Sequence, residues 1–186
     1  MSRGELDGYR HFSLEGARGF LDRPFERIEI GVLTGSPDSG FLRWLPTLPN
    51  ETGLVYQRPD WFVIKASDRG VPIQTMPPYS DTLLHSHPTY PDDVDDASMP
   101  STRDFLNASP HARNLIVSEK GITVYDPVAT TAQQRQLERA IHRNDFGPGT
   151  ENAYRDFLGE LGLIYNVREW DTLSEDDCHR LLEKST

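Results

Sequence analysis

Residues 82–88 read Thr-Leu-Leu-His-Ser-His-Pro. The apolar start predicts a β-strand, and the strand must end at Pro88 because proline has no N–H to donate to a sheet. Residues 101–108 then predict a short helix, and residues 114–125, NLIVSEKGITVY, predict two strands joined near Gly121. Strands and helices follow one another without regular βαβ alternation. This order predicts a mixed α/β (α+β) fold.

The prolines and glycines divide the chain into an irregular first half and a more regular second half. Residues 27–33 alternate polar and apolar side chains, which is the pattern of a half-buried strand. Further strands are predicted at residues 41–45, 53–56, 61–65 and 163–167, with a turn at residues 36–40. Helices are predicted at residues 131–142, 153–161 and 174–184. The first half is therefore expected to be rich in strands.

Composition excludes several classes of protein. The 186 residues include 19 Lys and Arg against 29 Asp and Glu, a formal net charge of -10, and no basic block suggests a nucleic-acid partner. The length fits one soluble domain, 1–186. No apolar run approaches the roughly 20 residues of a membrane span, and the N-terminus lacks the layout of a signal peptide. We expect a cytoplasmic protein, with delivery as a secreted effector left open.

Two pairs of polar residues suggest a metal site. Cys178 is the only cysteine, so any metal must bind through histidine and carboxylate side chains. His85 and His87 face the same side of a strand, and Ser101 and Asp104 share one face at the beginning of a helix. Two imidazoles and a carboxylate are the three ligands of a catalytic zinc ion, which keeps a fourth position for water. Ser101 is a candidate donor to the oxyanion that forms on the attacked carbonyl.

Each pair also has an ordinary explanation. His-x-His occurs by chance on many exposed strands, and Ser-x-x-Asp is a common variant of the helix capping box. In that case Ser101 caps the helix and Asp104 interacts with the helix dipole. The order of the two pairs, with an apolar strand before them and a helix after them, favours the metal site.

The order Glu, then His85-Ser86-His87-Pro88, then Ser101-x-x-Asp104 resembles the JAMM/MPN+ (JAB-domain) zinc metalloproteases, nearest to the bacterial branches associated with toxins and effectors. The resemblance covers residues 29–127, with an N-terminal extension at 1–24 and a C-terminal extension at 130–186. It implies a curved mixed sheet flanked by helices, in an MPN/JAB-like arrangement with cytidine-deaminase-like layering. It also implies that His85, His87 and Asp104 bind Zn²⁺, and that Ser101 assists the tetrahedral intermediate.

The activity implied by this resemblance is zinc-dependent hydrolysis of an amide or isopeptide bond in a protein or peptide substrate, ubiquitin-like conjugates among them. The family also has a catalytic glutamate on an early strand. Glu51, which begins Glu-Thr-Gly-Leu-Val-Tyr, is our preferred candidate for the general base. Glu29 is the alternative, although it stands one position late, and a one-residue slip on a strand turns the side chain to the other face.

Several features stay open at this point. Residues 88–100 include Asp92, Asp93, Asp95 and Asp96, and they form either a solvated acidic loop, a lid that selects a basic partner, or a source of another metal carboxylate. Residues 1–19 are an interaction arm, a delivery signal or a helix packed on the core. Two other functions also remain: a noncatalytic MPN-like interaction module, and a metal-dependent hydrolase of a non-peptide bond. The oligomeric state is not predicted.

Overall fold

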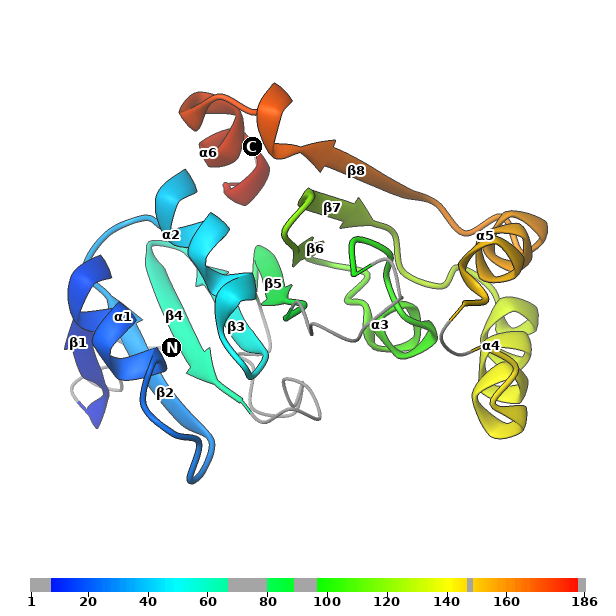
Figure 1. The fold of residues 1–186 in the computed structure, drawn as a ribbon, viewed down its shortest axis with the longest axis horizontal. Coiled ribbons are helices and arrows are strands. Elements are labelled where there is room, and N and C mark those ends of the chain that lie inside the picture. The colour runs from blue at the N-terminus through cyan, green and yellow to red at the C-terminus, as the bar shows by residue number, and fades with distance from the viewer. Residues whose placement is uncertain (1–7, 67–79, 89–96, 147–148, 184–186) are drawn as a thin grey trace.

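A computed structural model describes residues 8–66, 80–88, 97–146 and 149–183 of the chain (Figure 1). Within these residues, eight strands form one sheet in the order β1-β2-β4-β3-β5-β6-β7-β8. β1 pairs with β2 and β5 pairs with β6 in parallel, and the other neighbours are antiparallel. The predicted α/β (α+β) class with a mixed sheet is therefore confirmed.

The strands are β1 (Arg10–Phe12), β2 (Glu29–Leu33), β3 (Thr52–Gln57), β4 (Asp60–Lys65), β5 (Thr82–Ser86), β6 (Arg113–Val117), β7 (Gly121–Tyr125) and β8 (Tyr165–Glu169). The helices are α1 (Leu14–Leu21), α2 (Ser39–Trp44), α3 (Thr102–Asn107), α4 (Thr131–Arg143), α5 (Glu151–Glu160) and α6 (Glu175–Leu182). Two short 3₁₀ turns, η2 (Leu45–Thr47) and η4 (Trp170–Thr172), complete the described elements.

Helices cover both faces of the sheet. On one face, which we call the α1 face, strand residues share a core with α1, α2 and α6; its members include Ala17, Phe20, Leu33, Phe41, Leu42, Leu54, Val63, Leu84, Leu115, Cys178 and Leu182. On the other, the α3 face, strands β6 and β7 pack against α3, α4 and α5; the shared core includes Phe105, Ile116, Tyr125, Leu137, Tyr154 and Leu158. Figure 1 shows α4 and α5 beyond β6 and β7, at the end of the molecule away from α1.

Side-chain alternation assigns each strand residue to a face. In β5, Leu84 belongs to the core of the α1 face. Leu83 packs instead with Val55 and Phe62 in a small cluster, and this cluster lies on the α3 face because Val55 alternates with Leu54. The residue after Leu84 on the strand therefore also points to the α3 face.

The predicted strand at residues 41–45 is wrong, because this segment forms α2 and the start of η2. The Asp38 side chain accepts a hydrogen bond from the Phe41 amide at 2.6 Å, which caps a helix rather than closing the predicted turn at residues 36–40. Phe41, Leu42 and Leu45 are completely buried, and their spacing places them on one side of a helix. The apolar run Phe-Leu-Arg-Trp-Leu fits that period as well as a strand.

The two predicted extensions each contribute an edge strand of the sheet, β1 on one side and β8 on the other. The final strand lies two residues later than predicted, at Tyr165–Glu169. At the other edge, β1 pairs with residues 31–33 of β2. α1 is packed on the core through Ala17, Phe20 and Leu21, which agrees with the third possibility for residues 8–19; residues 1–7 lie outside the described part of the chain.

The C-terminal helix α6 is fastened to the beginning of β5 and β6. Thr82 Oγ1 donates a buried hydrogen bond to the carbonyl of Leu182 at 2.6 Å. The Arg113 guanidinium donates to the carbonyls of Arg180 and Leu181 at 2.6 and 2.7 Å. Among the described helices, none has the length and apolar character needed to cross a membrane.

Replacing Gly121 by alanine is expected to lower the free energy of unfolding by about 1–3 kcal/mol, the usual cost of overpacking. A Cβ at this position would lie 2.0 Å from the carbonyl oxygen of Arg168 on β8, so β7 and β8 would have to separate. Urea denaturation measures the change. Gly159→Ala on α5 is the matched control, since no heavy atom lies within 4 Å of its added Cβ, and it should be neutral or stabilising. Equal effects of the two variants would contradict the close approach of β8.

Candidate metal centre

The end of β5 brings both histidines to the α3 face. His85 is opposite Gly53 of β3 and Ile116 of β6. Ser86 lies on the buried α1 face, where its hydroxyl accepts a hydrogen bond from the Thr52 amide at 2.9 Å. The His87 amide donates to the carbonyl of Val117 at 2.8 Å, so the backbone stays attached to β6 for one residue beyond the strand. Both imidazoles thus stand on a backbone that neighbouring strands hold in place.

Asp104 reaches the same place from the first turn of α3. The Ser101 hydroxyl accepts from the Asp104 amide at 3.2 Å, and the Ser101 amide donates to Asp104 Oδ2 at 2.7 Å. This is a complete capping box. Phe105, which is fully buried, anchors the short helix against the Tyr125 ring with 5.6 Å between ring centroids. The ordinary explanation of Ser-x-x-Asp is therefore correct as far as it goes, and the same carboxylate also faces the histidines.

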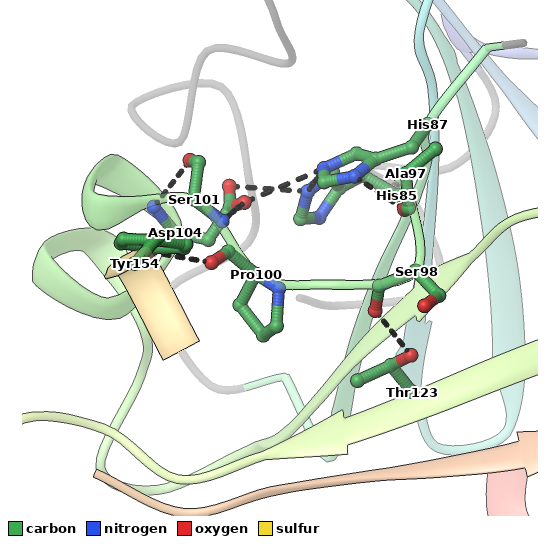
Figure 2. Close-up of polar contacts among 9 residues, drawn as sticks. All are labelled: His85, His87, Ala97, Ser98, Pro100, Ser101, Asp104, Thr123 and Tyr154. Carbon is green, nitrogen blue, oxygen red and sulfur yellow. Dashed lines mark hydrogen bonds and ion pairs between the residues drawn. The ribbon is translucent and has the colours of Figure 1, made fainter. Parts of the chain in front are cut away.

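Two imidazoles and one carboxylate meet at one point (Figure 2). His85 Nε2 lies 3.1 Å from His87 Nε2 and 3.1 Å from Asp104 Oδ1, while His87 Nε2 lies 3.4 Å from Asp104 Oδ2. Ligands bound tetrahedrally to zinc at about 2.0–2.1 Å lie roughly 3.3 Å apart. The three side chains can therefore hold a metal ion, and within the described residues no other group of three His, Cys, Asp or Glu side chains is arranged in this way.

The proton positions also favour a cation. His87 Nδ1 is 2.9 Å from the carbonyl oxygen of Ala97; a carbonyl only accepts, so Nδ1 carries the proton. In neutral His87, the Nε2 lone pair then faces His85 and Asp104. One N–H proton on His85 cannot serve both this lone pair and the carboxylate, whereas a divalent ion is attracted to all three atoms. Such a bond from the second ring nitrogen to a carbonyl is typical of metal-binding histidines.

Electrostatics tie the three groups together in the metal-free protein. Burial raises the pKa of Asp104, but the adjacent His85 and His87 outweigh burial and hold that pKa well below its usual value. Burial lowers the pKa of His85, but the charge and hydrogen bond of Asp104 outweigh it, with a smaller contribution from Glu51, so the net shift is upward. The site therefore attracts a positive charge, either a proton on His85 or a metal ion.

Of the two candidate glutamates, Glu51 lies on the face of the sheet that carries His85, and its charge acts on that histidine. Glu51 immediately precedes β3 and continues its pairing with β4, because the Ala66 amide donates to its carbonyl at 3.3 Å. By alternation Glu51 shares a face with Val55, which is the α3 face that carries His85. Its charge also contributes to the raised pKa of Tyr125, after burial and Asp104, which agrees with a position beside the site.

Glu29 lies elsewhere. It alternates with Leu33 on β2, which places it on the α1 face. Its register partner is Lys65 of β4, whose Nζ donates to the carbonyls of Phe20 and Arg23. Two strands, β4 and β3, separate Glu29 from β5. The opposite face and this distance across the sheet make Glu29 a poor partner for the histidines.

Ser101 stands at the exposed rim of the site. Its hydroxyl oxygen accepts from the Asp104 amide, and within the described residues no acceptor takes its O–H proton. The hydroxyl can therefore donate to a bound molecule. The acidic residues Asp92, Asp93, Asp95 and Asp96 lie outside the described residues.

Sequence reasoning missed the groups that surround the ligands. Carbonyl oxygens of Ala97, Ser98 and Pro100 accept hydrogen bonds from His87, Thr123 and Tyr154. Backbone acceptors carry no residue-type signal, and Tyr154 lies far from the motif in sequence. Only the fold reveals these contacts.

No protein-family model, curated protein or solved structure matches this chain. The resemblance to JAMM/MPN+ proteases therefore stays an expectation from the residues quoted above.

The wild-type protein should bind one divalent ion per chain, and His87→Ala should weaken zinc binding by more than the roughly 10–100-fold that loss of an outer-shell partner costs. Elemental analysis and competition with a chromophoric chelator measure stoichiometry and affinity. His142→Ala on α4, whose side chain is exposed, is the control and should bind zinc normally. Equal zinc binding by both variants would exclude His87 as a ligand.

The stability contributed by the His85–Asp104 pair in metal-free protein and the stability added by zinc should change in opposite directions with pH. The raised pKa of His85 and the lowered pKa of Asp104 make their pair stabilising between the ordinary values of 3.8 and 6.5. This stability is lost as pH rises through the folded-state pKa of His85. Zinc competes with protons, so the stabilisation that it adds should increase with pH. Thermal unfolding from pH 5 to 8 with zinc or with chelator tests this.

In the metal-free series, the quantity to follow is the difference in Tm between wild type and Asp104→Asn. Taking this difference removes the pH dependence that other titrating groups contribute to both proteins. This difference should shrink as pH rises. A difference that grows with pH would show that His85 and Asp104 do not form the pair.

Proposed function

We propose that this chain is a zinc-dependent hydrolase that cleaves an amide or isopeptide bond, with chemistry like that of the JAMM/MPN+ metalloproteases. The observation that carries the proposal is the convergence of His85, His87 and Asp104, whose ligand atoms all lie within 4.8 Å of one another. Two imidazole nitrogens and one carboxylate oxygen suit zinc. Three protein ligands also leave a position open, as in catalytic rather than structural zinc sites.

The surrounding side chains have the chemical properties that such a reaction needs. When bound, zinc supplies a water of lowered pKa and polarises the carbonyl of the substrate. The Glu51 carboxylate takes a proton from the attacking water and passes it to the leaving nitrogen. The Ser101 O–H donates a hydrogen bond to the carbonyl oxygen as it gains negative charge.

The local structure supports this division of roles. Asp104 is engaged by the Ser101 amide and the two imidazoles, so it serves as a ligand rather than as a base. Glu51 lies on the same face without being one of the three converging groups, as a base outside the metal's ligand set should. A noncatalytic interaction module would have no need for three converging metal ligands, so their convergence favours hydrolysis over that alternative.

Glu51→Gln should retain zinc but lose about 10²–10⁴-fold in hydrolysis rate, the usual contribution of a general acid or base. The assay offers the zinc-loaded protein ubiquitin-like conjugates, unmodified peptides and simple non-peptide esters, each with and without a chelator. Cleavage of a conjugate or peptide that chelator abolishes and zinc restores supports the proposal. Cleavage of the esters alone favours the non-peptide alternative.

Glu29→Gln is the matched control, because the same substitution on the α1 face should change neither zinc content nor rate. Full activity of Glu51→Gln would move the general base elsewhere. A protein that binds zinc yet cleaves nothing in the panel would contradict peptide hydrolysis, whereas a protein that binds no zinc would contradict the metal centre itself.

A further inference from the structure

The segment from Ala97 to Pro100, which leads into α3, is held by side chains from three separate elements. His87, at the end of β5, binds the carbonyl of Ala97 at 2.9 Å. Thr123 of β7 donates to the carbonyl of Ser98 at 2.6 Å, and Tyr154 of α5 donates to the carbonyl of Pro100 at 2.7 Å. Figure 2 shows these contacts on the same side of the sheet as the two imidazoles.

The contact from Tyr154 reaches the metal centre through one peptide group. The carbonyl of Pro100 and the amide of Ser101 belong to the same planar unit. Its oxygen accepts from Tyr154 Oη at 2.7 Å, and its N–H donates to Asp104 Oδ2 at 2.7 Å. The tyrosine hydroxyl, the peptide and the carboxylate therefore form one chain of hydrogen bonds, in which each bond polarises the next.

The position of Tyr154 is itself well fixed. Only 8% of the residue is exposed, and its ring packs against Phe146 with 5.0 Å between centroids. It shares a core with Phe105, the residue after Asp104. Burial and the charge of Asp104 raise the pKa of Tyr154 far above its ordinary value, so the hydroxyl keeps the proton that it donates.

We propose that Tyr154 is a positioning residue of the metal centre, which orients Asp104 through the Pro100–Ser101 peptide group. The inference rests on zinc binding in the proposed function and extends it to the C-terminal part of the chain. α3 is only six residues long, so its few buried contacts leave the carboxylate dependent on how the preceding segment is held. Without the tyrosine hydroxyl, the peptide group loses its buried donor and can rotate away from Asp104.

The test compares zinc affinity in wild type, Tyr154→Phe and Tyr165→Phe by competition with a chromophoric chelator. Tyr154→Phe should bind zinc about 10–100-fold more weakly, as loss of an outer-shell partner does. Tyr165 on β8 packs against the same core but makes no hydrogen bond to residues 97–104 in the described structure, so its loss of a hydroxyl is the matched control. It should leave affinity unchanged.

A second readout needs no metal. In chelator-treated protein, the Ser101 amide proton should resonate downfield in wild type and move upfield in Tyr154→Phe, because its bond to Asp104 weakens. Tyr165→Phe should not move it. A general loss of packing would lower thermal stability in both variants without this selective shift.

The outcomes separate the inference from the proposed function. Equal zinc affinity in all three proteins overturns the role of Tyr154 and leaves the metal centre standing. Absence of zinc binding in wild type overturns the proposed function. In that case the metal-free measurement still tests the inference: a Ser101 amide resonance that does not move in Tyr154→Phe overturns the positioning of Asp104 by Tyr154. Should Tyr154→Phe fail to fold, zinc added to the wild type must shift the ring resonances of Tyr154 and not those of Tyr165, by reciprocity; no shift at Tyr154 overturns the inference.

Discussion

Alternation of side chains along β5 is the constraint on which the candidate site depends. β5 lies between β3 and β6 in the middle of the sheet, so both of its edges are paired, and its two faces differ in burial: Leu83 and His85 are only partly buried. Leu84 and Ser86 are completely buried on the α1 face, and this commits His85 and His87 to the other. A shift of one residue would drive both imidazoles into an apolar core. The packing of α1, α2 and α6 against Leu84's face thereby fixes the direction of two histidines on the opposite face.

The features that could be predicted from sequence are those that short-range geometry determines. Two residues apart on a strand means one face, and Ser-x-x-Asp at a helix start means a cap, whatever the rest of the fold does. From these rules the positions of His85, His87 and Asp104 followed without knowledge of the sheet order. The choice between Glu51 and Glu29 was also a question of alternation, and the preferred Glu51 is the one on the face of His85.

The features that could not be predicted depend on tertiary contacts. Residues 41–45 fit the period of a strand or a helix, and the outcome was decided by Asp38 as a cap and by the core that receives Phe41. The hydrogen bonds to the carbonyls of Ala97 and Pro100 leave no trace in residue types, because any residue has a carbonyl. The sequence placed Gly121 near the junction of two strands. The structure adds a second requirement for glycine at this position, because the carbonyl of Arg168 on β8 lies too close to leave room for a Cβ.

Capping and metal binding by Asp104 are compatible because a carboxylate has two oxygens and several lone pairs. Oδ2 accepts from the Ser101 amide, which fixes the plane of the group and leaves Oδ1 directed at His85. His87 is fixed in turn by Ala97. Ligands that are already oriented lose little conformational freedom when a metal binds, so more of the coordination energy appears as affinity. A proton shared between His85 and Asp104 would form one hydrogen bond only. The lone pair on His87 Nε2 would then face His85 and Asp104 without a proton to accept.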